Sequence, residues 1–188
     1  TLLGQNVNSY LWEEKIKLSF PALLHELSRL DGLLRLRFTT SHPKDLSDDL
    51  ISSFCYIENL CNHIHLPFQA GSNRILKLMK RGYTREKYLE LIDKLRKTIP
   101  NVAITSAFMV GFPGESDEDF EMTLDLIRSV EFDSLFSFKY SDRKGTFAEK
   151  MDGKIDKTTK SSRLNILQGL QKKITLKNNK ALEGRQLE

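Results

Sequence analysis

Short apolar segments of the β type alternate along this chain with longer segments whose apolar residues recur at spacings of three and four. Strands are expected at 1–4, 33–38, 64–68, 102–110 and 134–140. Helical stripes run from Phe20 to Leu30, Leu46 to Ile57, Tyr88 to Ile99 and Phe120 to Ile127, with start signals at Ser19, Ser47 and Ser116. This order predicts an α/β fold with a parallel sheet or barrel, because crossover helices join parallel strands.

A polar or glycine-rich loop follows each expected strand. These loops are residues 5–6, 39–43, 69–72, 111–115 and 141–146. The carboxyl ends of all strands in a parallel barrel open on one face, so the five loops are expected to surround one ligand site. Taken singly, Gly111, Pro113 and Gly114 are explained by a tight turn, His42 before Pro43 by an extended dipeptide, and Gln69 by hydrogen bonds to local backbone groups. The agreement of five loops in register favours a site.

The side chains and turns of these loops indicate what the site would bind. The candidates drawn from the residues are Gln5, Asn6, Gln69, Gly111, Gly114 and Glu115. Backbone amides at the glycine turns suit carboxylate or phosphate, the side-chain amides suit ammonium and hydroxyl groups, and the glutamate is a candidate acceptor for an amine or a ribose. No catalytic general base is assigned, since the histidines fall in a helical stripe, before a proline, or in alternation along a strand.

Basic residues concentrate at the end of the chain. Of 29 Lys and Arg and 25 Asp and Glu, residues 154–188 hold 9 basic and 3 acidic ones. The lysines of the expected helix there are Lys172, Lys173, Lys177 and Lys180. A solvated helix face and a phosphate-facing stripe both explain them. Because residues 151–156 resemble a hinge, the expected domains are 1–153 and a basic C-terminal helix over 154–188.

The two cysteines, Cys55 and Cys61, match neither zinc spacing nor a radical-enzyme cluster triad, so no metal site is expected in this chain. No run of about 20 apolar residues and no basic-then-apolar leader is present in the sequence. A cytoplasmic location is the expectation.

Five motifs resemble those of the MiaB-type radical-S-adenosylmethionine (radical-SAM) tRNA methylthiotransferases, over nearly the whole chain. They are LLGQNVNSY (2–10), RFTTSHPKD (37–45), HLPFQAGS (65–72), FMVGFPGE (108–115) and YSDRKGT (140–146). The first two motifs resemble the branch that acts on N6-isopentenyladenosine. Ala70 stands where the family usually has serine, and Lys144 where it often has proline.

The resemblance implies an enzyme that adds a methylthio group to N6-isopentenyladenosine beside the tRNA anticodon. It implies S-adenosylmethionine and two four-iron, four-sulfur clusters as cofactors, and the tRNA anticodon stem-loop as partner, with the hard chemistry residing in the cofactors. By the same resemblance, Gln5 and Asn6 would lie near the methionine end of S-adenosylmethionine, Gln69 and Ser41 near its ribose, and Gly111, Gly114 and Glu115 along the adenine. RNA contacts would come from Arg143, Lys173, Lys177 and Lys180.

The family's cluster cysteines are not in this sequence, and a radical-SAM barrel has six strands where five are expected here. The expectation is therefore a partial (β/α)6 TIM-like barrel lacking its first strand, inactive by itself. Its uncovered edge at 1–4 is expected to pair with a second copy or to aggregate. Two alternatives stay open: a noncatalytic tRNA-binding module that uses the basic helix, and, ranked last, a phosphate-binding barrel enzyme.

Overall fold

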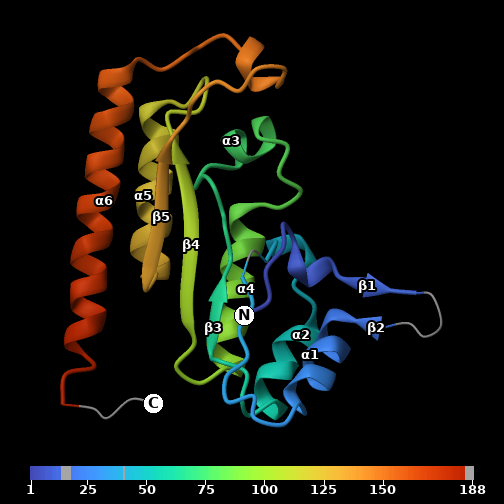
Figure 1. Ribbon diagram of the computed structural model, residues 1–188. Coiled ribbons are helices and arrows are strands. Elements are labelled where there is room, and N and C mark those ends of the chain that lie inside the picture. Colours follow the sequence, from blue (N-terminus) through green and yellow to red (C-terminus); the bar gives the residue numbers. More distant parts are fainter. Residues whose placement is uncertain (14–17, 40, 185–188) are drawn as a thin grey trace. The chain divides into compact units, whose positions relative to one another are not determined.

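The computed structural model describes residues 1–13, 18–39 and 41–184 of the chain (Figure 1). They form two compact units, each interleaved from two segments. Unit 1 comprises Thr1–Pro67 and Glu86–Thr105, and unit 2 comprises Phe68–Arg85 and Ser106–Glu188. Strand β4 (Ala103–Val110) therefore contributes its first residues to unit 1 and its remaining residues to unit 2.

Unit 1 contains a series of parallel backbone pairings. Leu2 pairs with Phe38, Leu36 pairs with Leu60, and β3 (His63–His65) pairs with the start of β4. The expected strands at 1–4 and 33–38 are thus present only as isolated bridges, whereas 102–110 is confirmed almost to the residue as β4. The helices are α1 (Phe20–Ser28), α2 (Asp48–Tyr56) and α4 (Arg85–Thr98), which match the three helical stripes expected in this part of the chain.

A short antiparallel pair in unit 1 was not predicted from the sequence. Strands β1 (Leu11–Trp12) and β2 (Leu18–Ser19) pair with Leu11 opposite Ser19. The 3-10 helix η1 (Val7–Ser9) precedes this pair, and the 3-10 helix η2 (Pro43–Asp45) lies between α1 and α2. Two-residue strands are too short for an alternating pattern to reveal them. Ser19 ends β2 and takes the N-cap position of α1 without a capping hydrogen bond from its side chain.

Unit 2 contains the rest of β4 and the neighbouring strand β5 (Ser134–Lys139), with helices α3 (Asn73–Leu78), α5 (Asp117–Val130) and α6 (Lys157–Lys180) and the 3-10 helix η3 (Ala148–Lys150). Helix α6 runs along β5 and α5 (Figure 1). Leu167 and Ile174 are buried on its inner face, and Gln171 Nε2 donates to the Phe132 carbonyl at 2.7 Å. Helix α3 was not predicted, because six residues are too few for a periodic stripe.

The start of α5 follows the sequence prediction closely. Ser116 is the N-cap, its Oγ accepts from the Asp119 amide, and the Asp119 carboxylate accepts from the Ser116 amide, which completes a capping box. This cap fixes where the loop after β4 ends. No helix among the described residues is long and apolar enough to cross a membrane.

Candidate functional site

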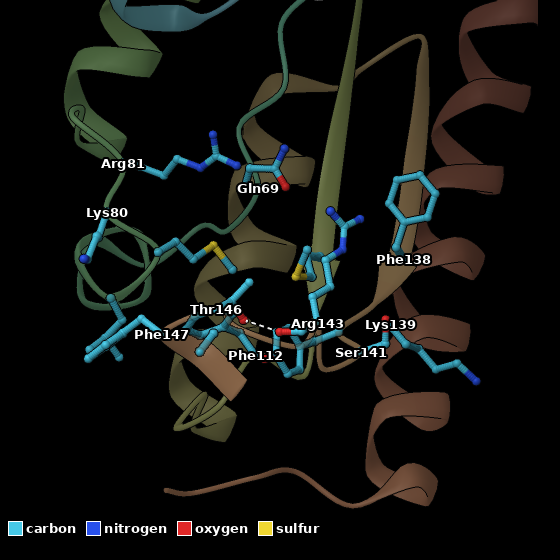
Figure 2. Close-up of a pocket in the computed structure, with 15 residues that line it drawn as sticks. Gln69, Lys80, Arg81, Phe112, Phe138, Lys139, Ser141, Arg143, Thr146 and Phe147 are labelled. Atoms are coloured by element: carbon cyan, nitrogen blue, oxygen red, sulfur yellow. Dashed lines mark hydrogen bonds between the residues drawn. The ribbon is translucent and has the colours of Figure 1, made fainter. Parts of the chain in front are cut away.

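A cavity of roughly 650 Å³ opens in unit 2 where β4 and β5 end. Figure 2 shows Gln69 and Arg81 along one side of it, Phe138 of β5 across from Lys80 and Phe147, and the Arg143 side chain between them. Met79, Met109 and Phe112 add apolar surface to the walls. A largely apolar cavity with a few polar groups at strand ends is the usual form of a small-molecule site in an α/β protein.

The cavity rim combines exposed aromatic rings with cations. Phe138 and Phe147 leave 55% and 64% of their surface exposed, and Lys80 Nζ lies 5.2 Å from the centre of the Phe147 ring. Arg143 is exposed as well, and its carbonyl accepts a 2.8 Å hydrogen bond from Thr146 Oγ1 that closes its loop (Figure 2). Aromatic faces beside cations are suited to stacking a base and contacting a phosphate.

Gln69 adopts a left-handed backbone conformation at the cavity wall, with φ of 82°. Its amide donates to the Ala107 carbonyl at 2.8 Å and its carbonyl accepts from Met109 N at 2.9 Å, so the pairing with β4 holds the residue in place. A non-glycine residue in this conformation costs about 1–3 kcal/mol, and such residues concentrate at ligand sites. Gln69, a candidate from the sequence, thus has a backbone conformation that is typical of functional residues.

The glycine loop after β4, residues 111–115, is held by a hydrogen bond within the loop. Gly111 and Gly114 have φ of 71° and 79°, which explains the need for glycine, and Gly111 N donates to Glu115 Oε2 at 2.7 Å. Burial raises the pKa of the Glu115 carboxyl, against the opposing effects of the Gly111 amide and of Arg163. Only Phe112 of this loop lines the cavity, so Glu115 lies where it shapes the loop instead of facing the cavity.

A second buried carboxylate, Asp119, connects this loop to the loop after β3. It accepts from Ser72 Oγ at 2.5 Å and from the amide and hydroxyl of Ser116 at 2.9 Å, and it forms an ion pair with Arg74. Arg74 also donates to the Gly114 carbonyl at 2.6 Å. Burial opposes ionisation, but these hydrogen bonds outweigh it and lower the pKa of Asp119 to about 2.

The remaining cofactor candidates lie in unit 1. Gln5 is exposed, Asn6 Nδ2 donates to Asp45 Oδ2 at 2.6 Å, and Ser41 is buried. Among the described residues, neither Asn6 Oδ1 nor Ser41 Oγ has a hydrogen-bond partner, although both atoms are buried. Buried polar atoms of this kind require a partner such as water or a ligand group.

Two further residues tie the loops of these candidates together. Asn8 Nδ2 donates to the His42 carbonyl at 3.0 Å, and the His42 amide donates to Asn8 Oδ1 at 2.9 Å. The loop after the first expected strand is thereby joined to the loop after the second.

The predicted RNA-contacting residues are not gathered in one place. The first part of α6 lies near the loop 140–146, which lines the cavity, because Lys160 Nζ donates to the Tyr140 carbonyl just after β5. Lys177 pairs with Glu131 at 2.5 Å, just before β5, about 25 Å further along the helix. Arg143 therefore lies at one end of β5, and Lys173, Lys177 and Lys180 lie towards the other end.

Sequence reasoning did not identify Phe138, Phe147 or Lys80 as site residues. Phe136 and Phe138 alternate along an expected strand, which places both on one face and was a usable signal. Phe147 and Lys80 lie in loops without a pattern. Within residues 1–13, 18–39 and 41–184, no group of three or more His, Cys, Asp or Glu is placed to hold a metal ion.

Comparisons with known proteins identify the family and the fold of the chain. The model of the radical SAM superfamily matches residues 4–127, and the chain belongs to that superfamily. Coproporphyrinogen III oxidase (HemN) from Escherichia coli, a radical SAM enzyme, has a similar fold, with a TM-score of 0.62 at 17% identity over 74% of this chain and 32% of that one. The α/β radical-SAM fold class is thereby confirmed.

Curated relatives match the chain from end to end. A protein of Syntrophus aciditrophicus (strain SB) is 56% identical over 99% of this chain, and one of Moorella thermoacetica is 49% identical over all of it. Both are named tRNA-2-methylthio-N(6)-dimethylallyladenosine synthase, which confirms the resemblance found in the motifs. The chain covers 40% and 42% of the length of these two relatives.

Proposed function

We propose that this chain is the cofactor- and base-binding part of a radical-SAM enzyme that methylthiolates a prenylated adenosine in tRNA. The observation that carries the proposal is the unit 2 cavity, in which the strained Gln69 and the apolar strand ends lie beside exposed rings and Arg143. Such a cavity offers one wall to a nucleoside cofactor and another to an unstacked base with an apolar substituent.

The residues present fit S-adenosylmethionine. When bound with its iron–sulfur cluster, this cofactor supplies the methyl group and the radical chemistry. We assign Gln69 and Ser41 to its ribose, Gln5 and Asn6 to its methionine end, and the backbone of the loop around Gly111 and Gly114 to its adenine. The unpartnered Asn6 Oδ1 and Ser41 Oγ support this assignment. Glu115 would act on the adenine through the loop that it braces.

The finer architecture and the partners belong to the same proposal. The strand positions would form part of a (β/α)6 barrel over 1–153, followed by the basic helix segment of 154–188. The whole enzyme would carry two four-iron clusters and bind the anticodon stem-loop, with Arg143 at the reacting base and Lys173, Lys177 and Lys180 on a more distant part of the RNA backbone. The cytoplasmic location and pairing with a second copy stay predictions.

The proposal is tested in the full-length protein after anaerobic cluster reconstitution. With S-adenosylmethionine, a sulfur source and tRNA that bears N6-dimethylallyladenosine, mass spectrometry of the tRNA nucleosides should detect the 2-methylthio product. Gln69→Ala should weaken S-adenosylmethionine binding about three- to tenfold, the value of one hydrogen bond. Gln168→Ala, which alters an exposed glutamine of α6, is the matched control. Cofactor cleavage without any methylthiolated nucleoside would contradict the assignment.

The tRNA-binding module is the alternative, and ionic strength separates it from the enzyme. A module that binds only phosphates should lose tRNA affinity steeply as the salt concentration rises, whereas the affinity of the enzyme for S-adenosylmethionine should change little. A full-length protein that binds tRNA in this manner and has no measurable affinity for S-adenosylmethionine would favour the module.

A further inference from the structure

Helix α6 reaches the glycine loop through one buried residue, Arg163. Its Nη1 donates to Glu115 Oε2 at 2.7 Å and to the Glu115 carbonyl at 3.0 Å, and its Nη2 donates to Asp117 Oδ1 at 2.7 Å. The side chains of Arg163 and Glu115 are only 7% and 1% exposed. Burial disfavours a charged guanidinium, but the hydrogen bonds to Asp117 and Glu115 outweigh it and raise the pKa of Arg163.

The same segment of chain contacts the loop at two glycines. A Cβ on Gly111 would lie 2.4 Å from Lys160 Cγ, so the lysine stem covers that glycine directly. The Gly153 carbonyl accepts from Gly114 N at 2.8 Å. Residues of the segment 153–163 therefore contact the loop at Gly111, Gly114 and Glu115, and Arg163 makes the ion pair among these contacts.

Anchoring α6 to unit 2 does not require this arginine. Leu167, Gln171 and Ile174 already bury the inner face of the helix. A buried ion pair is seldom more stabilising than apolar residues of the same size, whereas its directed hydrogen bonds fix geometry. The hydrogen bonds of Arg163 go to the carboxylate that accepts from Gly111 N and to the next groups along the chain, so they are matched to the loop. Its guanidinium also lies 5.5 Å from the centre of the buried Phe120 ring.

We propose that Arg163 is a positioning residue for S-adenosylmethionine: it holds Glu115, and through Glu115 the Gly111–Glu115 backbone, in the conformation that receives the adenine. The inference rests on the proposed function, because it assigns that ligand to the loop. It also means that any displacement of α6, the helix that carries the lysines, changes the cofactor site.

The test compares variants of the full-length protein with reconstituted iron–sulfur clusters, by calorimetric titration with S-adenosylmethionine and by steady-state kinetics. Arg163→Met should raise Kd and KM for S-adenosylmethionine about tenfold, a typical size for coupling between linked groups, with kcat at saturation little changed. Arg163→Lys, which keeps the charge but not the planar fork, should lie between wild type and Arg163→Met. Arg128→Met removes an exposed arginine that also pairs with two carboxylates, Glu121 and Asp125, and should leave Kd unchanged.

A double-mutant cycle adds a readout that general destabilisation does not move. Glu115→Gln should weaken binding by a similar factor, and combining it with Arg163→Met should add little, because both act through one contact. A folded Arg163→Met protein with wild-type Kd, or fully additive effects, would overturn the inference. If Arg163→Met does not fold, Arg163→Lys and Glu115→Gln decide it, and unchanged binding in both overturns it. A wild-type protein that binds no S-adenosylmethionine would instead refute the proposed function, on which this inference depends.

Discussion

Replacing Asp119 by asparagine would remove one negative charge from the buried start of α5 with almost no change in volume. The carboxylate accepts from Ser72, Ser116 and Arg74, and the side chain of Asp119 is only 7% exposed. An asparagine would have to direct amide hydrogens towards at least one of these donors. The loops after β3 and β4, which frame the proposed site, would lose their shared acceptor.

The size of the effect follows from the pKa of Asp119. The folded protein lowers it from 3.8 to about 2, which corresponds to about 2 kcal/mol of stability in the ionised form. Since the folded value is the lower one, this stability is fully present above pH 4 and is lost as the pH falls towards 2. Asp119→Asn should therefore destabilise the protein by about 2 kcal/mol at pH 7, or about 1 M in the urea midpoint.

Urea unfolding followed by circular dichroism at pH 7, 4 and 2 measures both quantities. Asp125→Asn is the matched control on the same helix, because Asp125 is about half exposed and pairs with Arg128, and it should change stability by less than about 0.5 kcal/mol. The gap between wild type and Asp119→Asn should close as the pH falls. Equal effects of the two variants, or a gap that persists at pH 2, would refute the reasoning.

Three other predictions concern the glycines, the exposed aromatic rings and the basic residues. Gly71→Ala should cost about 3 kcal/mol in thermal unfolding, because its Cβ would lie 2.4 Å from backbone atoms of Met122 and Thr123; Gly114→Ala, with open space around it but a positive φ, should cost about 1 kcal/mol. Phe138→Ala and Phe147→Ala should leave stability nearly unchanged and, if either ring stacks on a base, weaken tRNA binding by the full-length protein by about 1–3 kcal/mol. No change in filter binding would remove the rings from the proposed site. Changing Lys173, Lys177 and Lys180 together to alanine should lower the slope of log K against log salt by about 2 to 3, while Arg143→Ala should lower it by about 1; equal slopes would leave the lysines as a solvated face.

Helices and strands with a strong local sequence signal could be predicted from the sequence. The Ser116 cap with acids behind it gave the start of α5, and the apolar run at 102–110 gave β4. The expected strands at 1–4 and 33–38 are reduced to isolated bridges, Leu2 with Phe38 and Leu36 with Leu60. Helix α3 and the β1–β2 pair are too short to carry a period, so their formation depends on tertiary contacts.

The candidate site also combines residues that the sequence indicates with residues that only the folded structure brings together. Gln69 and the glycine loop could be proposed from the sequence because their motifs are contiguous, but the residues that hold the loop come from far along the chain. Arg163 lies 48 residues from Glu115, and Asp119 lies 47 residues from Ser72. A buried arginine in a basic helix resembles its exposed neighbours in sequence, so only the folded structure separates Arg163 from the solvated lysines.

The charge around the glycine loop bears on which ligand it accepts. Glycine turns at a helix start commonly bind phosphate, and the sequence left that possibility open. Here Asp117, Glu118 and Asp119 occupy the first turn of α5, so the positive end of the helix is already neutralised by carboxylates. With Glu115 there are four acids near the loop, and three of them, Glu115, Asp117 and Asp119, pair with the guanidiniums of Arg74 and Arg163. A dianionic phosphate would meet repulsion at this helix start, whereas a neutral adenine on a sulfonium-bearing cofactor would not. The electrostatics of the loop therefore favour S-adenosylmethionine over the phosphate ligand of an aldolase-like or isomerase-like barrel.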